Sequence, residues 1–117
     1  MSTSEVFVIS ETPSLASALV ELLEADGLPV VAVHDLGVVG EMRSVESKQQ
    51  PPVLICASNG FHCESARRWR DGELNDSDLV VVGTRDPELR SHGHLHVVPL
   101  PLHPHELLDL VHSLLHN

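Results

Sequence analysis

Aromatic residues are scarce in this chain, and tyrosine is absent: Phe, Trp and Tyr together make up 3% of 117 residues. Val, Leu, Ile and Ala must therefore supply the core, and hydrophobic residues as a whole reach 42%. A chain of this length suits one domain with one core, so we expect residues 1–117 to form a single domain. No internal repeat, linker or low-complexity stretch divides it.

Positive charge is also scarce, because 7 Lys and Arg residues stand against 17 Asp and Glu residues, for a formal net charge of −10. Such a chain has few cations with which to displace counterions from phosphates, so it is not expected to bind nucleic acid or an anionic membrane by itself. No apolar run approaches the ~18 residues of a membrane span. The start, MSTSEV, lacks the basic residues and apolar stretch of a signal peptide.

Cysteine occurs only twice, at Cys56 and Cys63, and Cys56 lies inside an apolar run. Two thiols, one of them expected to be buried, do not make the disulfide framework of a small secreted domain. They are typical of a protein in a reducing cytosol, and together with the missing membrane span and signal peptide they lead us to expect a soluble, cytoplasmic protein.

Five short apolar runs predict buried strands. They are Val6–Ile9, Pro29–Val33, Val53–Ala57, Leu79–Val82 and His96–Val98. Uniformly apolar strands that alternate with helices indicate a parallel sheet covered on both faces. Only Arg85–His94 separates the fourth strand from the fifth, so any helix there is short or absent.

Four segments have helix signals. The first begins at Thr12 and Pro13, with the threonine hydroxyl as cap and proline at the first helical position, and stops at Gly27. The last, Pro104–Leu115, repeats apolar residues at helical spacing. Between them lie a helix capped by Asp35 and a weaker one over Ser65–Leu74. Their expected inner faces are Val38, Met42 and Val45 for the former and Ala66 and Trp69 for the latter.

Three segments, in the right order, resemble the receiver domain of bacterial response regulators. Val6–Thr12 (VFVISET) resembles the family's I-L-V-V-D-D-E, and Pro52–Ala57 (PVLICA) resembles its D-L-V-L-L-D. The most specific match is Val98–Leu108 (VPLPLHPHELL), which resembles x-x-K-P-F-x-P-x-E-L-L. The resemblance covers essentially the whole chain. It implies an α/β, flavodoxin-like (β/α)5 fold, a three-layer sandwich with a central five-stranded parallel sheet, here with the fourth helix short or absent.

The same resemblance implies a phosphorylation chemistry whose residues are almost all replaced. The family transfers a phosphoryl group to an aspartate, and two carboxylates at the end of the first strand hold Mg²⁺. Ser10 and Glu11 stand at that acidic pair, which leaves one carboxylate. Ala57 stands at the acceptor position, and its neighbour Ser58 cannot form an acyl phosphate.

The cation and the switch residue of the family are replaced as well. Leu100 stands where the family has lysine, and Lys48, the only lysine, lies before the third strand. Gly83 falls at the Ser/Thr switch position, with Thr84 one residue further. We therefore interpret the chain as a degenerate pseudo-receiver that lacks the phosphoacceptor aspartate. It is expected to be no enzyme, to need no cofactor, and to signal without phosphorylation, through a protein partner of a two-component system or through a homodimer.

Nine histidines leave a second interpretation open, a metal- or pH-responsive sensor. His62, His103 and His105 are expected on loops at the carboxyl ends of the strands, together with Glu11 and Cys63. Imidazole, thiolate and carboxylate groups suit Zn²⁺ or a similar metal, and imidazole titrates near neutral pH. No C-x-x-C or H-x-x-x-H spacing supports a metal site, and solvated loop histidines are the simpler interpretation.

Arg67, Arg68 and Arg70 concentrate three of the seven positive charges within four residues. They suit either a docking patch for an acidic partner or a solvated helix face offset by neighbouring acids. Cys63, just before them, leaves a third interpretation open, a small Cys-dependent hydrolase or transferase. The spacing of the C-x5-R phosphate loop fails, however, because Trp69 stands where the arginine would be.

Overall fold

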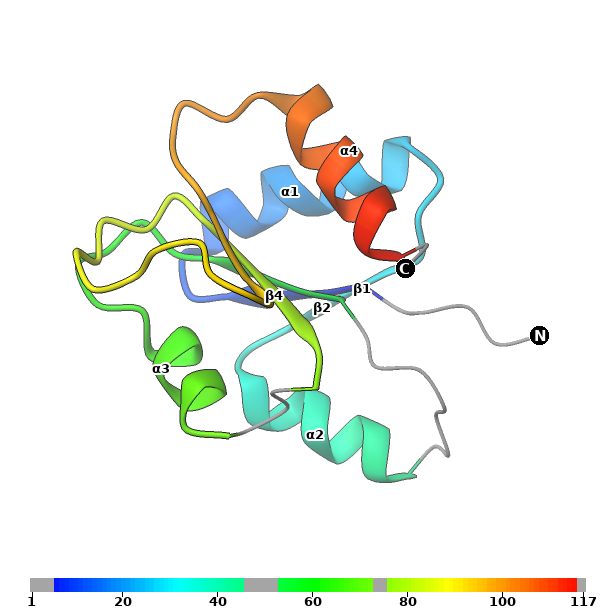
Figure 1. Cartoon of the computed structure of the whole chain (residues 1–117). Helices are drawn as coiled ribbons and strands as arrows, with labels where there is room; N and C mark the ends of the chain where they lie inside the picture. The colour runs from blue at the N-terminus through cyan, green and yellow to red at the C-terminus, as the bar shows by residue number, and fades with distance from the viewer. Residues whose placement is uncertain (1–5, 46–52, 73–75, 116–117) are drawn as a thin grey trace.

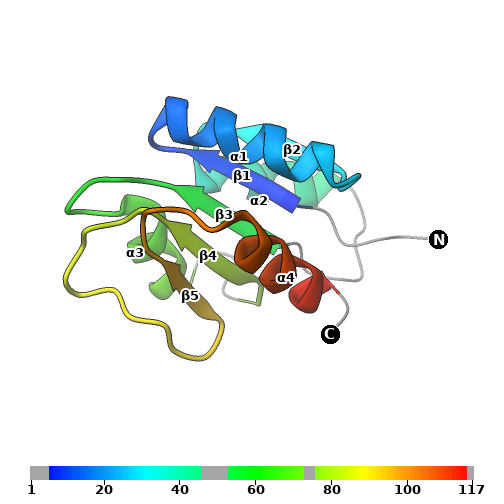
Figure 2. The same cartoon turned by 90° about the horizontal axis from the view of Figure 1, so that it is seen from above.

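The computed structural model describes residues 6–45, 53–72 and 76–115, apart from the side chains of residues 42–45. Its five strands form one sheet in the order β2-β1-β3-β4-β5, and every neighbouring pair is parallel. The strands are β1 (Val6–Ser10), β2 (Val30–Val33), β3 (Val53–Ala57), β4 (Asp78–Val82) and β5 (Leu95–Val98). Seen from above, β2 and β5 are the two edges (Figure 2). The predicted five-stranded parallel sheet is confirmed.

Two layers of helices cover the sheet (Figure 1). Helices α1 (Pro13–Ala25) and α4 (Pro104–Leu115) lie on one face, and α2 (Leu36–Val45) and α3 (Glu64–Arg70) lie on the other. Alternate side chains of each central strand enter opposite layers of the core, so Phe7 packs with the α2–α3 layer and Val8 with the α1–α4 layer. Burial on both faces explains why β1 and β3 are apolar at nearly every position.

Helix α1 follows the predicted boundaries, but its predicted cap is wrong. Pro13 occupies the first turn, and the chain leaves the helix through Gly27, whose φ is +84°. The Thr12 hydroxyl makes no capping hydrogen bond to the helix. It donates instead to Oδ1 of Asn59 at 3.2 Å and accepts from the Asn59 backbone N–H at 3.1 Å, so it joins the loops after β1 and β3.

Helix α2 has the predicted cap and a different buried face. The Val38 N–H donates to Oδ1 of Asp35 at 3.2 Å, which confirms the cap. The residues fully buried against the sheet are Leu36 and Val39, while Val38 is only half-buried. The predicted face also included Met42 and Val45, whose side chains lie outside the described residues.

Helix α3 buries the two residues that the sequence placed inside. Ala66 and Trp69 face the core, and the Trp69 indole N–H donates to the Ser77 carbonyl at 3.0 Å. Helix α3 ends at Arg70, earlier than predicted, and residues 73–75 lie outside the described part. Helix α4 has the predicted bounds and buries Leu107 and Val111.

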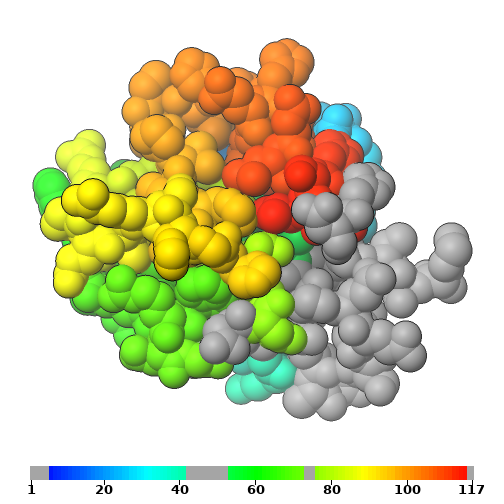
Figure 3. Space-filling model, in the orientation of Figure 1, coloured from blue at the N-terminus to red at the C-terminus, as the bar shows by residue number. Residues whose placement is uncertain are grey.

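The connection from β4 to β5, residues 83–94, contains no helix, so the predicted loss of the family's fourth helix is confirmed. Near its end it folds back on β5, where His92 and Leu95 form an isolated antiparallel bridge. The Val97 N–H donates to the Ser91 hydroxyl at 2.9 Å. In the space-filling view this connection (yellow) covers the surface between α3 (green) and α4 (orange to red) (Figure 3). Among the described residues, no helix is both long and apolar enough to cross a membrane.

Candidate functional site

The residues singled out from the sequence follow the carboxyl ends of neighbouring strands. The strand register aligns Ser10 with Ala57 and Ala57 with Val82, so the loops that begin there lie at one edge of the sheet. Backbone hydrogen bonds join these loops: Thr12 N–H to the Ala57 carbonyl at 2.8 Å, and Ser58 N–H to the Val82 carbonyl at 3.2 Å. These backbone hydrogen bonds therefore fix the positions of the loops relative to one another.

The position that the sequence resemblance assigns to the phosphoacceptor is closed. Ala57 is fully buried and packs in the core layer under α1 and α4. Its neighbour Ser58 is also buried. Ser10 and Glu11 face opposite sides of the sheet: Ser10 lines a shallow hollow with Ala16 and other residues of α1, whereas Glu11 faces α3. The two positions do not form a pair of converging groups.

Gly83 and Leu100, which the sequence resemblance assigns to the switch and lysine positions, pack against one another. Gly83 is buried with a φ of +88°, and a Cβ added there would lie 3.3 Å from a methyl carbon of Leu100 and 3.1 Å from one of Leu15. Leu100 itself is 48% exposed, and the Leu100–Pro101 peptide bond is cis. An apolar side chain thus covers the place at which the family resemblance puts a cation.

The Thr84 hydroxyl hydrogen-bonds to backbone groups of neighbouring loops. Its hydroxyl accepts a hydrogen bond from the Asp86 N–H at 3.1 Å and donates to the Gly60 carbonyl at 3.5 Å. These contacts join the start of the β4–β5 connection to the loop after β3. Both the donor and an acceptor site of the hydroxyl are therefore used in these hydrogen bonds.

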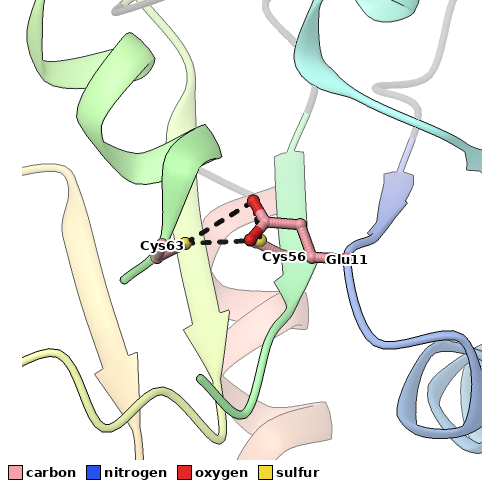
Figure 4. Close-up of side chains that lie close together, drawn as sticks. All are labelled: Glu11, Cys56 and Cys63. Carbon is pink, nitrogen blue, oxygen red and sulfur yellow. Dashed lines mark hydrogen bonds between the residues drawn. The ribbon is translucent and has the colours of Figure 1, made fainter. Parts of the chain in front are cut away.

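Glu11, Cys56 and Cys63 form a compact cluster under α3 (Figure 4). The two sulfur atoms are 3.6 Å apart, and Oε2 of Glu11 lies 3.4 Å from Cys56 Sγ and 3.8 Å from Cys63 Sγ. The Ser65 N–H donates to the same carboxylate oxygen at 2.9 Å. Both cysteines are fully buried and unpaired by a disulfide, and Glu11 is half-buried.

The cluster changes the protonation of its members. Burial would raise the pKa of Glu11, but hydrogen bonds from Ser65, Cys56 and Ser58 stabilise the carboxylate and hold that pKa below its usual value. A hydrogen bond from the Cys56 thiol lowers the pKa of Cys63. The hydrogen bond to Cys63 and the burial of Cys56 raise the pKa of Cys56. Cys63 is therefore the thiol of the pair that loses its proton first.

An ion pair supports the cluster from the other side of α3. Asp86, whose side chain is fully buried, accepts hydrogen bonds from the Cys63 N–H at 3.3 Å and from the Arg67 guanidinium at 2.9 Å. Burial would raise the pKa of Asp86, but the Glu88 and Cys63 N–H groups and the Arg67 charge outweigh it and lower that pKa. Arg67 also contacts Glu88 at 2.7 Å. These contacts favour the interpretation of the arginines as a face offset by neighbouring acids.

The described residues contain one group of three or more His, Cys, Asp and Glu side chains whose ligand atoms converge, and it is Glu11, Cys56 and Cys63. Of the residues proposed from the sequence, Glu11 and Cys63 are brought together; His62, His103 and His105 belong to no such group. His62 contacts Glu64 at 3.3 Å instead. Cys56 was missed as a ligand, although alternation along β3 could have placed it opposite to Ala57 and toward Cys63.

Mg²⁺ does not fit these residues. Magnesium requires oxygen ligands in an octahedron and is held in such sites by carboxylates. At this edge Glu11 supplies a single carboxylate beside two thiols, and the side chain of Ala57 has no oxygen. The donor set is soft, and it suits a different class of ion.

No protein-family model matches the chain, and no curated protein matches it. Among solved structures it is similar to the receiver domain of the sensor histidine kinase PA1611 from Pseudomonas aeruginosa PAO1, a crystal structure with a magnesium ion coordinated in the active-site cleft. The TM-score is 0.65 at 14% sequence identity, over 99% of this chain and 100% of that one. The chain therefore has the receiver-domain fold.

Proposed function

We propose that this chain is a pseudo-receiver, a receiver-like regulatory domain that signals through protein contacts without aspartyl phosphorylation. The observation that carries the proposal is the pair of replacements at Ala57 and Leu100. The sequence resemblance assigns the acceptor position to a buried methyl group and the cation position to an isobutyl group, within a fold that retains the five-stranded sheet and four helices. Phosphoryl transfer requires a nucleophile and a neutralising cation, and neither is available there.

The remaining polar groups of the site support the same conclusion. Glu11 is engaged by the Ser65 N–H and by two thiols, and Thr84 is engaged by backbone groups. Loss of the aspartates removes like-charge repulsion at the strand ends, so the core can persist without the phosphorylation chemistry. The Cys63 thiol, fully buried, is not accessible to a substrate, which disfavours the hydrolase interpretation.

The contact surface that we favour lies at the carboxyl edge of the sheet. Phe61 and Leu100 are large hydrophobic side chains that are 71% and 48% exposed. The Arg85 guanidinium lies 5.8 Å from the centre of the Phe61 ring, at the start of the β4–β5 connection. Exposed aromatic and arginine side chains are enriched in protein interfaces, so a protein partner or a second copy of the chain is the expected occupant.

The decisive experiment is a titration with beryllofluoride and Mg²⁺, followed through amide NMR shifts, with a phosphorylatable receiver domain as positive control. We expect no saturable shift at Glu11, Ser58, Thr84 or Leu100, because the acceptor carboxylate is missing. A saturable response confined to these amides would overturn the phosphorylation-independent proposal.

The protein-contact part is tested by light scattering after size exclusion and by capture of partners with immobilised protein. Phe61→Ser is the variant expected to reduce self-association or capture. A strictly monomeric protein that captures no partner, or contacts that are unchanged in Phe61→Ser, would remove the support for this surface.

A further inference from the structure

The Glu11, Cys56 and Cys63 cluster has a geometry that suits a metal ion as well as the hydrogen bonds among its members. The three ligand atoms form a triangle with edges of 3.4, 3.6 and 3.8 Å. A tetrahedral zinc ion, with bonds of about 2.3 Å to sulfur and about 2.1 Å to oxygen, separates two sulfurs by about 3.8 Å and a sulfur from an oxygen by about 3.6 Å. The observed edges agree with these separations to within about 0.2 Å.

We infer that Glu11, Cys56 and Cys63 form a binding site for a thiophilic divalent cation, Zn²⁺, at the edge where the fold family coordinates Mg²⁺ with oxygen. Two thiolates and one carboxylate supply three corners of a tetrahedron, and the fourth is left to solvent or another ligand. This donor set is soft and differs in class from the all-oxygen set that magnesium needs. The inference is independent of whether the chain signals as a pseudo-receiver.

The surroundings hold the ligands as metal sites require. The Ser65 N–H donates to Oε2 of Glu11 at 2.9 Å and fixes the orientation of the carboxylate. Asp86 accepts from the Cys63 N–H at 3.3 Å and fixes the backbone that carries the second thiol. Such outer contacts orient ligands and raise metal affinity.

Charge and access are also compatible with a cation. The bound ion would face three anionic groups once both thiols have released their protons to the solvent, and its two positive charges would offset most of that charge. Both sulfurs are buried, whereas Glu11 is half-buried, so the carboxylate side is the route by which an ion enters. The ligands come from the end of β1, from β3 and from the residue before α3, so binding would join these three elements.

The test uses the whole chain, stripped of metal with a chelator and kept reduced without oxygen, with Co²⁺ as a spectroscopic probe. We expect one Co²⁺ to bind per chain and to give a near-ultraviolet sulfur-to-cobalt charge-transfer band together with the visible bands of tetrahedral cobalt. Zn²⁺ should displace it one for one. This readout uses the unmodified chain, so it decides the question even if a cysteine variant fails to fold.

Three variants assign the ligands, each checked for fold by circular dichroism. Cys56→Ser and Cys63→Ser should each weaken Zn²⁺ binding by at least about a hundredfold and remove about half of the charge-transfer intensity, more than the ten- to hundredfold typical of losing an outer contact. Glu11→Gln should retain the charge-transfer band, because both thiolates remain, and weaken binding by more than the roughly tenfold minimum for an outer contact. The matched control, His62→Ala with His103→Ala, should bind as the unmodified chain does.

Four outcomes would overturn the inference. They are no binding by the unmodified chain tighter than about 100 µM, cobalt bound without a charge-transfer band, affinity unchanged in a folded Cys63→Ser variant, and affinity lost in the histidine control. The last outcome would show that the histidines, and not this cluster, bind the metal. Because none of these measurements involves phosphorylation or a protein partner, failure here and failure of the proposed function are distinguishable.

Discussion

Asp86 joins the β4–β5 connection to α3 through a fully buried side chain. Its carboxylate accepts from the N–H groups of Cys63 and Glu88 and from the Arg67 guanidinium. An amide in place of this carboxylate keeps one acceptor oxygen and leaves at least one of these donors unpaired in a buried place, which costs more than an exposed ion pair contributes. Local stability at the site thus depends on one residue that sequence patterns did not single out.

Asp86→Asn is expected to lower the free energy of unfolding by about 2 kcal/mol at pH 7. The matched control is Glu88→Gln, which removes the exposed carboxylate on the same arginine and should cost less than about 1 kcal/mol. Urea denaturation of chelator-treated, reduced protein measures both. Equal costs for the two variants would show that burial of Asp86 adds nothing.

The same residue predicts a pH dependence. The pKa of Asp86 is lower in the folded protein than in the unfolded chain, so its stabilising effect is present above the unfolded value, about 3.9, and is lost as the pH falls through the folded value. The stability difference between the unmodified chain and Asp86→Asn should therefore shrink below about pH 4. A difference that stays constant down to pH 2 would contradict the assignment.

Gly83 is a second residue on which the stability of the carboxyl edge of the sheet depends. Its φ of +88° disfavours any Cβ, and an added Cβ would also crowd Leu15 and Leu100 at 3.1 and 3.3 Å. Gly83→Ala should cost about 1–2 kcal/mol for the backbone conformation alone, and more with the contacts. Gly93→Ala is the control, because Gly93 has a φ of +60° and open space around it. Thermal unfolding of both variants separates the steric part, and a smaller loss for Gly83→Ala would contradict it.

At the scale of elements, the caps show what a local pattern can and cannot predict. Asp35 caps α2 as expected because its partner, Val38, is three residues away. The Thr12 hydroxyl does not cap α1, because its partner Asn59 lies 47 residues further along the chain and reaches it only in the folded protein. Local signals therefore located the helices, while long-range contacts decided how individual side chains are used.

Asp35 provides the test at this scale. Asp35→Ala should destabilise the protein by about 1 kcal/mol through loss of the α2 cap. Asp35→Asn retains the cap but loses the charge that faces Arg68 at 4.0 Å, so it should stay within a few tenths of a kcal/mol of the unmodified chain. Chemical denaturation measures both. If Asn is as destabilising as Ala, the ion pair and not the cap would be the cause.

The same contrast holds for the candidate site. The sheet order brings Glu11 and Ala57 to one edge, as the alternation of strands and helices predicted. The sequence also indicated Cys63 as a candidate metal ligand, but the predicted site combined its thiol with histidines. Cys56 was hidden in an apolar run, because a free cysteine packs in a core like a small hydrophobic residue and its thiol gives no separate signal in the sequence. Only the packing of α3 on β3 shows that the two sulfurs meet.

At the scale of the whole molecule, substitution of the exposed Phe61 can test protein association independently of folding stability. The side chain is 71% exposed, so Phe61→Ser should change the free energy of unfolding by less than about 0.5 kcal/mol. It should nevertheless weaken protein contacts if the carboxyl edge is the interface. Parallel denaturation and light-scattering measurements test the two parts, and a large loss of stability would mean that Phe61 packs in the core.

The fold that the β4–β5 connection adopts has a consequence for how this protein can associate. Edge strands offer unpaired backbone groups on which another chain can add a strand, and natural proteins commonly protect them. Along β5 the Leu95 N–H donates to the His92 carbonyl at 3.0 Å and the Val97 N–H to the Ser91 hydroxyl. A foreign strand would have to displace both. The segment that replaces a helix thereby shields the β5 edge from edge-to-edge aggregation, so association at this edge falls to side-chain surfaces.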